Sequence, residues 1–217
     1  MMDNNNQTIE KAGFVIKMRR PEGEPPFPVM LMLHGWTGDE NSMWIFAGRL
    51  PEDALLIAPR GIYPSPLGGY SWQDAENRRW PKLQDFDPAL EALLALLRPQ
   101  NFPEADFADL RAVGFSQGAA LTYALALLHP DKLVSFGGMS GFLPGEVDAV
   151  IAQRPLAGKH AFVTHGTQDE MVDVQRAREA VEKLEQAGAQ VTYCEDDVGH
   201  KLSLTCFKGL EAFFERY

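Results

Sequence analysis

Apolar segments of strand length alternate with segments of helical pattern along most of this chain, and this alternation limits the folds that it can adopt. Continuous apolar runs at 29–35 and 161–166 are typical of strands that are covered on both faces. Helical patterns lie between such runs; Asp87 and Pro88 open one of them, and Asp173 opens another. The alternation predicts an α/β fold in which a mostly parallel, twisted sheet carries helices on both faces.

One domain accounts for the whole length. Domains usually span about 50–250 residues, and this chain has 217, of which 45% are apolar and can form a sizeable core. We therefore expect a single α/β domain over residues 1–217, with residues 1–10 poorly ordered and no large lid domain. The expected strands are 13–20, 29–35, 54–61, 110–115, 132–140, 161–166 and 190–195, and the expected helices are 42–50, 87–98, 117–129, 174–187 and 203–216.

The charge balance argues against several kinds of partner. Thirty acidic residues outnumber 20 Lys and Arg, and the formal net charge of -10 disfavours nucleic acids and anionic membranes as ligands. No uninterrupted apolar stretch approaches the ~18 residues of a membrane span, and the polar start lacks the pattern of a secretory signal. The two cysteines, Cys194 and Cys206, indicate no disulfide framework, so we expect a reducing, cytoplasmic location.

The segment Gly114-Phe115-Ser116-Gln117-Gly118 matches the GxSxG pattern of a nucleophile elbow. It lies between an expected strand and an expected helix, which is the context that this turn requires. A strand that turns directly into a helix strains the residue at the turn, and side chains two positions before and after it would clash. The two glycines remove those clashes, so the pattern indicates Ser116 as a nucleophile that points out above the sheet.

A serine nucleophile needs a base, because an isolated hydroxyl is a poor nucleophile near neutral pH. The chain has five histidines, and four of them are better explained as structural residues at or near strand and helix ends: His34, His129, His160 and His165. The fifth, His200, lies in the loop after the last expected strand. This position, together with the chain order of the other parts, indicates His200 as the base.

The histidine in turn needs an acid that orients it, and this acid should follow an intervening strand. Asp169 comes shortly after such a strand, and the order Ser116, Asp169, His200 is the one that this type of fold uses. Glu170 and Asp173 are the alternatives, although Asp173 is better explained as the N-cap of the helix that follows it.

The oxyanion that develops during acyl transfer needs two N–H donors that are already in place. One is the backbone amide of Gln117, which follows the nucleophile at the start of a helix. The other should come from the loop at 34–38, whose glycines let the backbone approach closely. Trp36 is the candidate in that loop, with Thr37 as the alternative.

Four segments, LMLHGWTGDENS, GFSQGAA, HGTQDEMV and GHKLS, together resemble the α/β-hydrolase superfamily. Within it they resemble the small lidless phospholipase/carboxylesterase family, which includes the acyl-protein thioesterases. The resemblance spans roughly residues 29–203. It implies an α/β-hydrolase fold, with the nucleophile at Ser116, the acid at Asp169, the base at His200 and the oxyanion amides at Trp36 and Gln117.

The resemblance extends to the substrate pocket. In the family a Trp-x-Asp pattern lines the acyl pocket, and residues 71–74, Ser-Trp-Gln-Asp, are similar to it. Trp36 and Trp80 depart from the family pattern by their bulk, and Lys201 follows the histidine where many members have a smaller or acidic residue. We expect the acyl and alcohol sites to be lined by Trp36, Trp72, Leu67, Tyr70, Trp80 and Met139.

These features predict a serine carboxylesterase that cleaves esters and thioesters of short to medium apolar acyl groups through an acyl-enzyme. Its partner would be a small-molecule ester, and a homodimer is compatible with the sequence. We expect no cofactor, and a metal site at His165 and Asp169 would lack a third ligand. Two alternatives stay open: a serine peptidase or amidase, since the same triad cleaves amides, and a weakly catalytic ligand-binding protein of the same fold.

Overall fold

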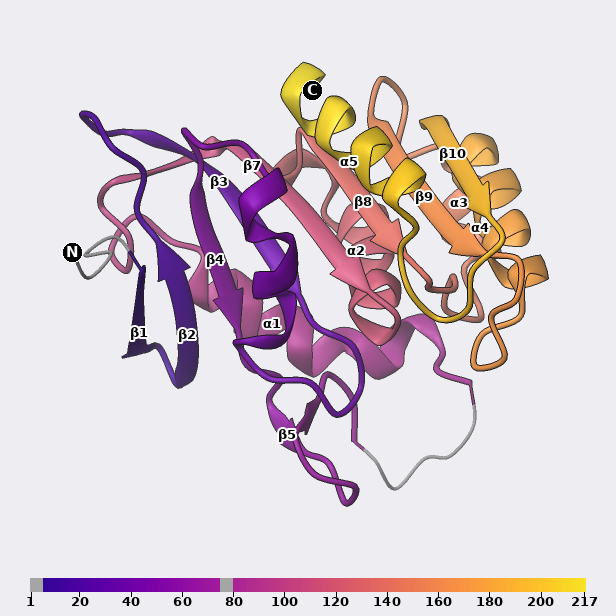
Figure 1. Cartoon of the computed structure of the whole chain (residues 1–217), viewed down its shortest axis with the longest axis horizontal. Helices are drawn as coiled ribbons and strands as arrows, with labels where there is room; N and C mark the ends of the chain where they lie inside the picture. The colour runs from indigo at the N-terminus through magenta and orange to yellow at the C-terminus, as the bar shows by residue number, and fades with distance from the viewer. Residues whose placement is uncertain (1–5, 75–79) are drawn as a thin grey trace.

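One eight-stranded sheet runs through the protein, in the order β1-β2-β4-β3-β7-β8-β9-β10 (Figure 1). The structure is a computed structural model that describes residues 6–74 and 80–217. The strands are β1 (Asn6–Lys11), β2 (Phe14–Arg19), β3 (Phe27–Leu33), β4 (Leu55–Pro59), β7 (Ala105–Phe115), β8 (Ser135–Met139), β9 (His160–Gly166) and β10 (Gln190–Asp196). The β1–β2 and β2–β4 pairs are antiparallel and all other pairs in this sheet are parallel, which confirms the predicted mostly parallel sheet.

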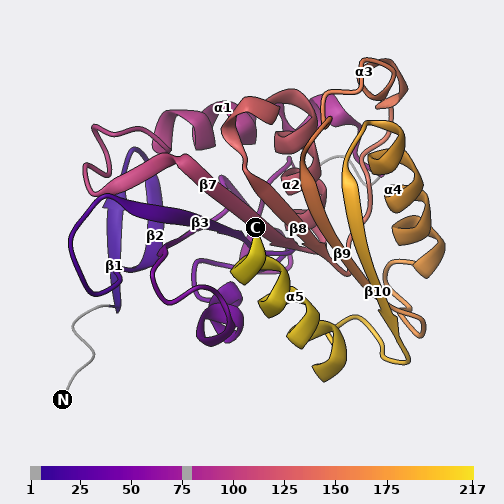
Figure 2. The ribbon, with the colours of Figure 1, turned by 90° about the horizontal axis from the view of Figure 1, so that it is seen from above.

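Helices cover both faces of the sheet, as the alternation predicted (Figure 2). One face carries α1 (Asp87–Leu96), α2 (Gln117–Leu128), α3 (Asp148–Ile151) and α4 (Val174–Gln186). The other face carries the 3₁₀ helix η1 (Ser42–Arg49) and α5 (Leu204–Arg216). Two short 3₁₀ helices, η2 (Leu83–Phe86) and η3 (Pro130–Lys132), and a small hairpin of β5 (Tyr63–Pro64) and β6 (Tyr70–Ser71) complete the described elements. The described residues form no lid domain over this sheet.

The helix boundaries follow from local chemistry. At the start of α4 the side chain of Asp173 accepts a hydrogen bond from the Gln175 amide at 2.8 Å, so Asp173 is the N-cap that the sequence predicted. Gly188 follows the end of α4 with φ +103°, a conformation that favours glycine. One face of α4 is buried through Ala177, Ala180 and other small or aliphatic side chains, while its charged residues face solvent.

The N-terminal residues differ from the prediction. Residues 6–10 were expected to be poorly ordered, but they form most of β1, which pairs with β2 through the register Asn6↔Arg19 to Lys11↔Phe14. The two strands are joined by Ala12 and Gly13, both with positive φ, as in a tight hairpin turn. Because β1 is an exposed edge strand, its sequence lacks the apolar alternation that would have revealed it.

The cysteines also differ from the prediction, because Cys194 of β10 and Cys206 of α5 form a disulfide bond. They lie 12 residues apart in the chain, and the loop between β10 and α5 returns so that their Cα atoms are 5.6 Å apart. The argument for a reducing compartment from unpaired cysteines is therefore wrong.

The described part of the chain contains no helix with the length and hydropathy of a transmembrane span.

The sheet topology brings distant segments together at one edge. Strands β3, β7, β9 and β10 are parallel, so their carboxyl ends meet on the same side (Figure 1). Ligands of open α/β sheets bind beyond such ends. Four loops meet there in this protein: residues 34–41 after β3, the turn at Ser116 after β7, residues 167–173 after β9 and residues 197–203 after β10.

Candidate active site

The turn between β7 and α2 holds Ser116 in a strained conformation, with φ 54° and ψ -114°. Such a positive φ is uncommon for a residue other than glycine. The flanking glycines are required by close contacts of the backbone. A Cβ at Gly114 would lie 2.1 Å from the carbonyl oxygen of Gly118, and a Cβ at Gly118 would lie 2.1 Å from the carbonyl oxygen of Leu33. The geometry is that of a nucleophile elbow, with Ser116 at the N-terminus of α2.

Asp169 and His200 are in direct contact. Nδ1 of His200 lies 2.6 Å from Oδ2 of Asp169, and Oδ1 of Asp169 accepts hydrogen bonds from the Met171 and Val172 amides at 2.9 Å each. Burial alone would raise the pKa of Asp169, but the hydrogen bonds from Val172, His200 and Met171 lower it below its ordinary value. Asp169 is therefore ionised at neutral pH and holds the imidazole of His200 in one orientation.

The two alternative acids lie elsewhere. Asp173 caps α4, and the Glu170 side chain is exposed to solvent.

His165 is buried next to Asp169. Its Nε2 lies 2.8 Å from the Val172 carbonyl oxygen and 3.3 Å from Oδ2 of Asp169, and its side chain is fully buried. In residues 6–74 and 80–217 no three His, Cys, Asp or Glu side chains are grouped so that they could hold a metal ion.

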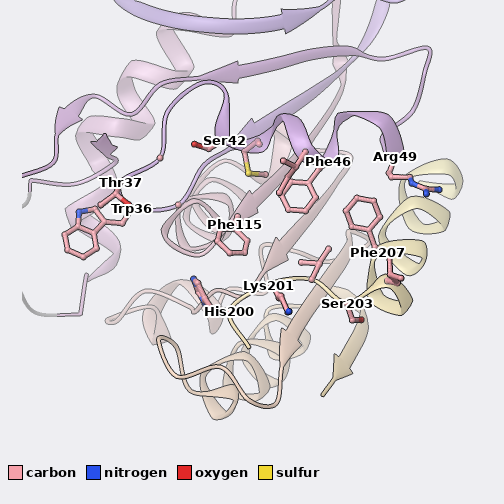
Figure 3. Close-up of a pocket in the computed structure, with 16 residues that line it drawn as sticks. Trp36, Thr37, Ser42, Phe46, Arg49, Phe115, His200, Lys201, Ser203 and Phe207 are labelled. Atoms are coloured by element: carbon pink, nitrogen blue, oxygen red, sulfur yellow. The ribbon is translucent and has the colours of Figure 1, made fainter. Parts of the chain in front are cut away.

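The imidazole of His200 lies beside the elbow. Its ring centroid is 4.9 Å from that of Phe115, the residue before Ser116, and Figure 3 shows the two rings next to each other at the pocket. Among the hydrogen bonds of the described residues, none uses the Ser116 hydroxyl or Nε2 of His200. Both atoms are thus uncommitted within the part of the chain that the structure describes.

The loop after β3 lies against the elbow. A Cβ at Gly35 would lie 3.2 Å from Cβ of Ser116, so the next backbone amide, that of Trp36, is close to Ser116. The Trp36 amide donates to no carbonyl among the described residues, whereas the Thr37 amide donates to the Tyr70 carbonyl at 2.9 Å. Thr37 is therefore not available as an oxyanion donor. The Gln117 amide is the first of α2 and has no carbonyl within the helix to bond.

His34 fixes the start of this loop. Its Nε2 accepts a hydrogen bond from the Gly61 amide at 2.8 Å, and its Nδ1 therefore carries the proton and donates to the Gly35 carbonyl at 2.6 Å. Burial lowers the pKa of His34 below its ordinary value, so the ring is neutral. The structural interpretation of His34 is confirmed by these contacts.

The β5–β6 hairpin supports the same loop from the other side. The side chain of Gln117 accepts from the Trp72 amide at 3.0 Å and donates to the Ser71 hydroxyl at 3.1 Å, which ties the elbow to β6. Arg60 forms two hydrogen bonds with Glu40, at 2.7 and 3.0 Å, and a third with the Tyr70 hydroxyl at 3.1 Å. These contacts, with the hydrogen bond from the Thr37 amide to the Tyr70 carbonyl, hold the backbone on both sides of Ser116 in place, as preorganised amides require.

Five residues that the sequence predicted for the pocket do not line the cavity beside His200, namely Trp72, Leu67, Tyr70, Trp80 and Met139. For Trp72 and Met139 the prediction is wrong because both side chains are fully buried. The Trp72 ring instead packs on His34, and its Nε1 donates to the His34 carbonyl at 2.8 Å. Leu67 is at the exposed tip of the hairpin, the Tyr70 hydroxyl is bonded to Arg60, and the Trp80 ring packs against Phe142.

The cavity beside His200 has a volume of about 620 Å³ and opens between η1 and the start of α5 (Figure 3). This size suits a small organic ligand. Trp36 lines it, as the sequence predicted, but η1 and the segment 201–207 were missed. Most lining side chains are apolar: Trp36, Met43, Ile45, Phe46, Phe115, Leu202, Leu204 and Phe207. The cavity can hold an apolar group next to His200, whose Nε2 is uncommitted; Ser116 itself does not line it, although Phe115, the residue before it, does.

Comparisons with known proteins show the family and the fold of this chain. The family model described as Phospholipase/Carboxylesterase matches residues 16–216. Acyl-protein thioesterase 1 of Kluyveromyces lactis is 28% identical over 178 residues, which cover 73% of this chain and 77% of that protein. Esterase YpfH of Escherichia coli is 26% identical over 194 residues, which cover 82% of this chain and 78% of that protein. The fold is that of the Bacillus cereus carboxylesterase, with a TM-score of 0.82 at 21% identity over 94% of each chain.

Proposed function

The chain belongs to the phospholipase/carboxylesterase family, and from this premise we propose that it hydrolyses esters and thioesters of short to medium apolar acyl groups. Ser116 is the nucleophile, His200 the general base and Asp169 the residue that orients the base. The observation that carries the proposal is the 2.6 Å contact between His200 and the buried carboxylate of Asp169, at the same sheet edge as the strained Ser116.

The first step is acylation of the serine. Oγ of Ser116 attacks the carbonyl carbon of the ester while Nε2 of His200 takes the hydroxyl proton. The negative charge that develops on the carbonyl oxygen is stabilised by the amides of Trp36 and Gln117. When the tetrahedral intermediate collapses, the bond to the leaving group breaks, and the imidazolium of His200 gives its proton to the departing alcohol or thiol.

The second step releases the acid. Water attacks the acyl-enzyme as Nε2 of His200 takes a proton, and collapse of the second intermediate returns that proton to Oγ of Ser116. In both steps the imidazolium is stabilised by Asp169, which is ionised at neutral pH because of its hydrogen bonds. The amides near Ser116 are held by the hairpin contacts, so little reorganisation accompanies the reaction.

Turnover of matched substrates tests the reaction class. Purified protein is assayed with 4-nitrophenyl esters, an acyl thioester and 4-nitroanilide amides of the same acyl groups, and Ser116→Ala serves as the control. We expect rapid cleavage of ester and thioester that the variant loses. Preferential amide cleavage would favour the peptidase alternative, and binding of an ester without turnover would favour the ligand-binding alternative.

Location and assembly form a separate part of the proposal. We propose a cytoplasmic protein; the Cys194–Cys206 disulfide argues against this location, because disulfides rarely persist in a reducing compartment. Thiol alkylation in cells before lysis, followed by mass spectrometry, tests this: alkylated cysteines support the cytoplasm, and blocked cysteines refute it. Light scattering of the purified protein tests the homodimer that the sequence allows.

A further inference from the structure

The cavity beside His200 differs in charge from the rest of the chain. Its charged lining side chains are Arg49 and Lys201, and no Asp or Glu lines it. The whole chain, by contrast, has 30 acidic and 20 basic residues. Cations in a largely apolar cavity attract an anionic ligand group more strongly than the same cations would in open solvent.

Lys201 is the better placed of the two cations. It follows His200 directly, and Figure 3 shows its side chain between those of His200 and Ser203 at the cavity. Its backbone amide donates to the Gly199 carbonyl, which fixes the turn that carries it. Within the described ranges no carboxylate forms an ion pair with the Lys201 ammonium group. The charge is therefore available to a ligand.

Arg49 lies at the other end of the cavity. Its guanidinium is 5.9 Å from the ring centroid of Phe207, and Figure 3 shows both on the side away from His200. Its ion pair with Glu211 is long, at 3.4 Å, and the Arg49 side chain is half exposed, so this pair holds the guanidinium only weakly. Between the two cations the walls are apolar, with Phe46, Phe115 and Phe207 among them.

We propose that the substrate carries an anionic group at the end of an apolar arm, and specifically that monoesters of aliphatic dicarboxylic acids are preferred over neutral esters of equal length. The apolar arm lies along the aromatic walls, and its terminal carboxylate meets Lys201 or, for a longer arm, Arg49. This inference rests on the proposed function, since it presupposes cleavage of an ester at Ser116. It adds the charge of the substrate, which the hydrolytic machinery alone does not specify.

The test compares two esters that differ only in the terminal charge: 4-nitrophenyl hexanoate and the mono-4-nitrophenyl ester of adipic acid. The measured quantity is the ratio of kcat/KM for the anionic ester to kcat/KM for the neutral ester. We expect a ratio above one in the wild-type protein, a fall of about fivefold in Lys201→Gln and a larger fall in Lys201→Glu. The change should lie mainly in KM, because the contact binds ground state and transition state alike.

Lys208→Gln is the matched control, because Lys208 is an exposed lysine of α5 that does not line the cavity and its loss changes the net charge equally. The ratio should stay within about twofold of wild type in this variant, and added salt should lower it in the wild type. The inference is overturned if the wild-type ratio is below one, or if the ratio is unchanged in both Lys201→Gln and Arg49→Gln. In either case, cleavage of the neutral ester still supports the proposed function. Failure to cleave either ester overturns both.

Discussion

Replacement of Asp169 by Asn is the change whose effect the structure specifies most fully. Oδ1 of Asp169 accepts the Met171 and Val172 amides, so an asparagine must keep its carbonyl oxygen at that position. Its amide nitrogen then takes the position of Oδ2, 2.6 Å from Nδ1 of His200. An NH₂ group in that position donates, so Nδ1 must accept and the imidazole proton moves to Nε2. Nε2, the base nitrogen of the proposed mechanism, is then protonated and cannot take the proton of Ser116.

The magnitude follows from this tautomer change. The same substitution in serine proteases keeps the geometry and lowers kcat by about 10⁴-fold. At about 1.36 kcal/mol for each factor of ten, this corresponds to about 5.4 kcal/mol of transition-state stabilisation. We expect a similar loss here, because two backbone amides fix the orientation of the new side chain and no rotation restores an acceptor toward His200. The fold should be retained, since the side chains have the same shape.

The assay is steady-state hydrolysis of a 4-nitrophenyl ester, with circular dichroism melting as a check on folding. Glu170→Gln is the matched control, because this neighbouring carboxylate is exposed and lies outside the contact with His200. We expect kcat of the control to stay within about threefold of wild type. A folded Asp169→Asn protein with kcat within tenfold of wild type would refute the role of the carboxylate. A 10⁴-fold loss in Glu170→Gln would show that the acid is Glu170.

Three further outcomes test the fold around the site. Gly118→Ala places a Cβ 2.1 Å from the Leu33 carbonyl oxygen, and we expect it to lower the free energy of unfolding by about 3 kcal/mol, measured by thermal melting. A melting temperature equal to that of the wild type would contradict the close contact between Gly118 and Leu33. Reduction of the Cys194–Cys206 disulfide should lower the free energy of unfolding in urea by about 3 kcal/mol, and two titratable thiols in the folded, non-reduced protein would exclude that bond. The Arg178 side chain lowers the pKa of Glu195 from 4.5 to about 2; because this pKa is depressed, its stabilising effect is present above about pH 4.5 and disappears toward pH 2. Glu195→Gln should therefore narrow the difference in stability between pH 6 and pH 3, and an unaltered difference would count against the ion pair.

The elbow could be read from the sequence because its constraint is local. A strand that turns into a helix at Ser116 leaves no room for a Cβ two residues before or after it. The sequence therefore has glycine at positions 114 and 118. The parallel sheet was predictable for a similar reason, since strands buried on both faces are continuously apolar. The edge strand β1 was missed because an exposed strand carries no such pattern.

The pocket could not be read from the sequence, because it depends on the direction of side chains in loops. Trp72 was expected to contact substrate, but this residue, which follows β6, packs its ring on His34, and its Nε1 donates to the buried His34 carbonyl. Segment 42–50 was expected to be a helix, and the 3₁₀ helix η1 that forms there contributes both the exposed Ile45 and the buried Phe46 to the cavity. The disulfide was missed for a related reason: spacing in the chain does not show that the loop after Cys194 returns to it.

The central claim is that His200, held by Asp169, makes the hydroxyl of Ser116 nucleophilic. Its most direct test is labelling with a fluorophosphonate, with the modified residue located by peptide mass mapping and the rate compared between wild type and His200→Ala. We expect a single label on Ser116, and a rate at least about 10³-fold lower in the variant. A label on another residue, or equal rates in the two proteins, would contradict the claim.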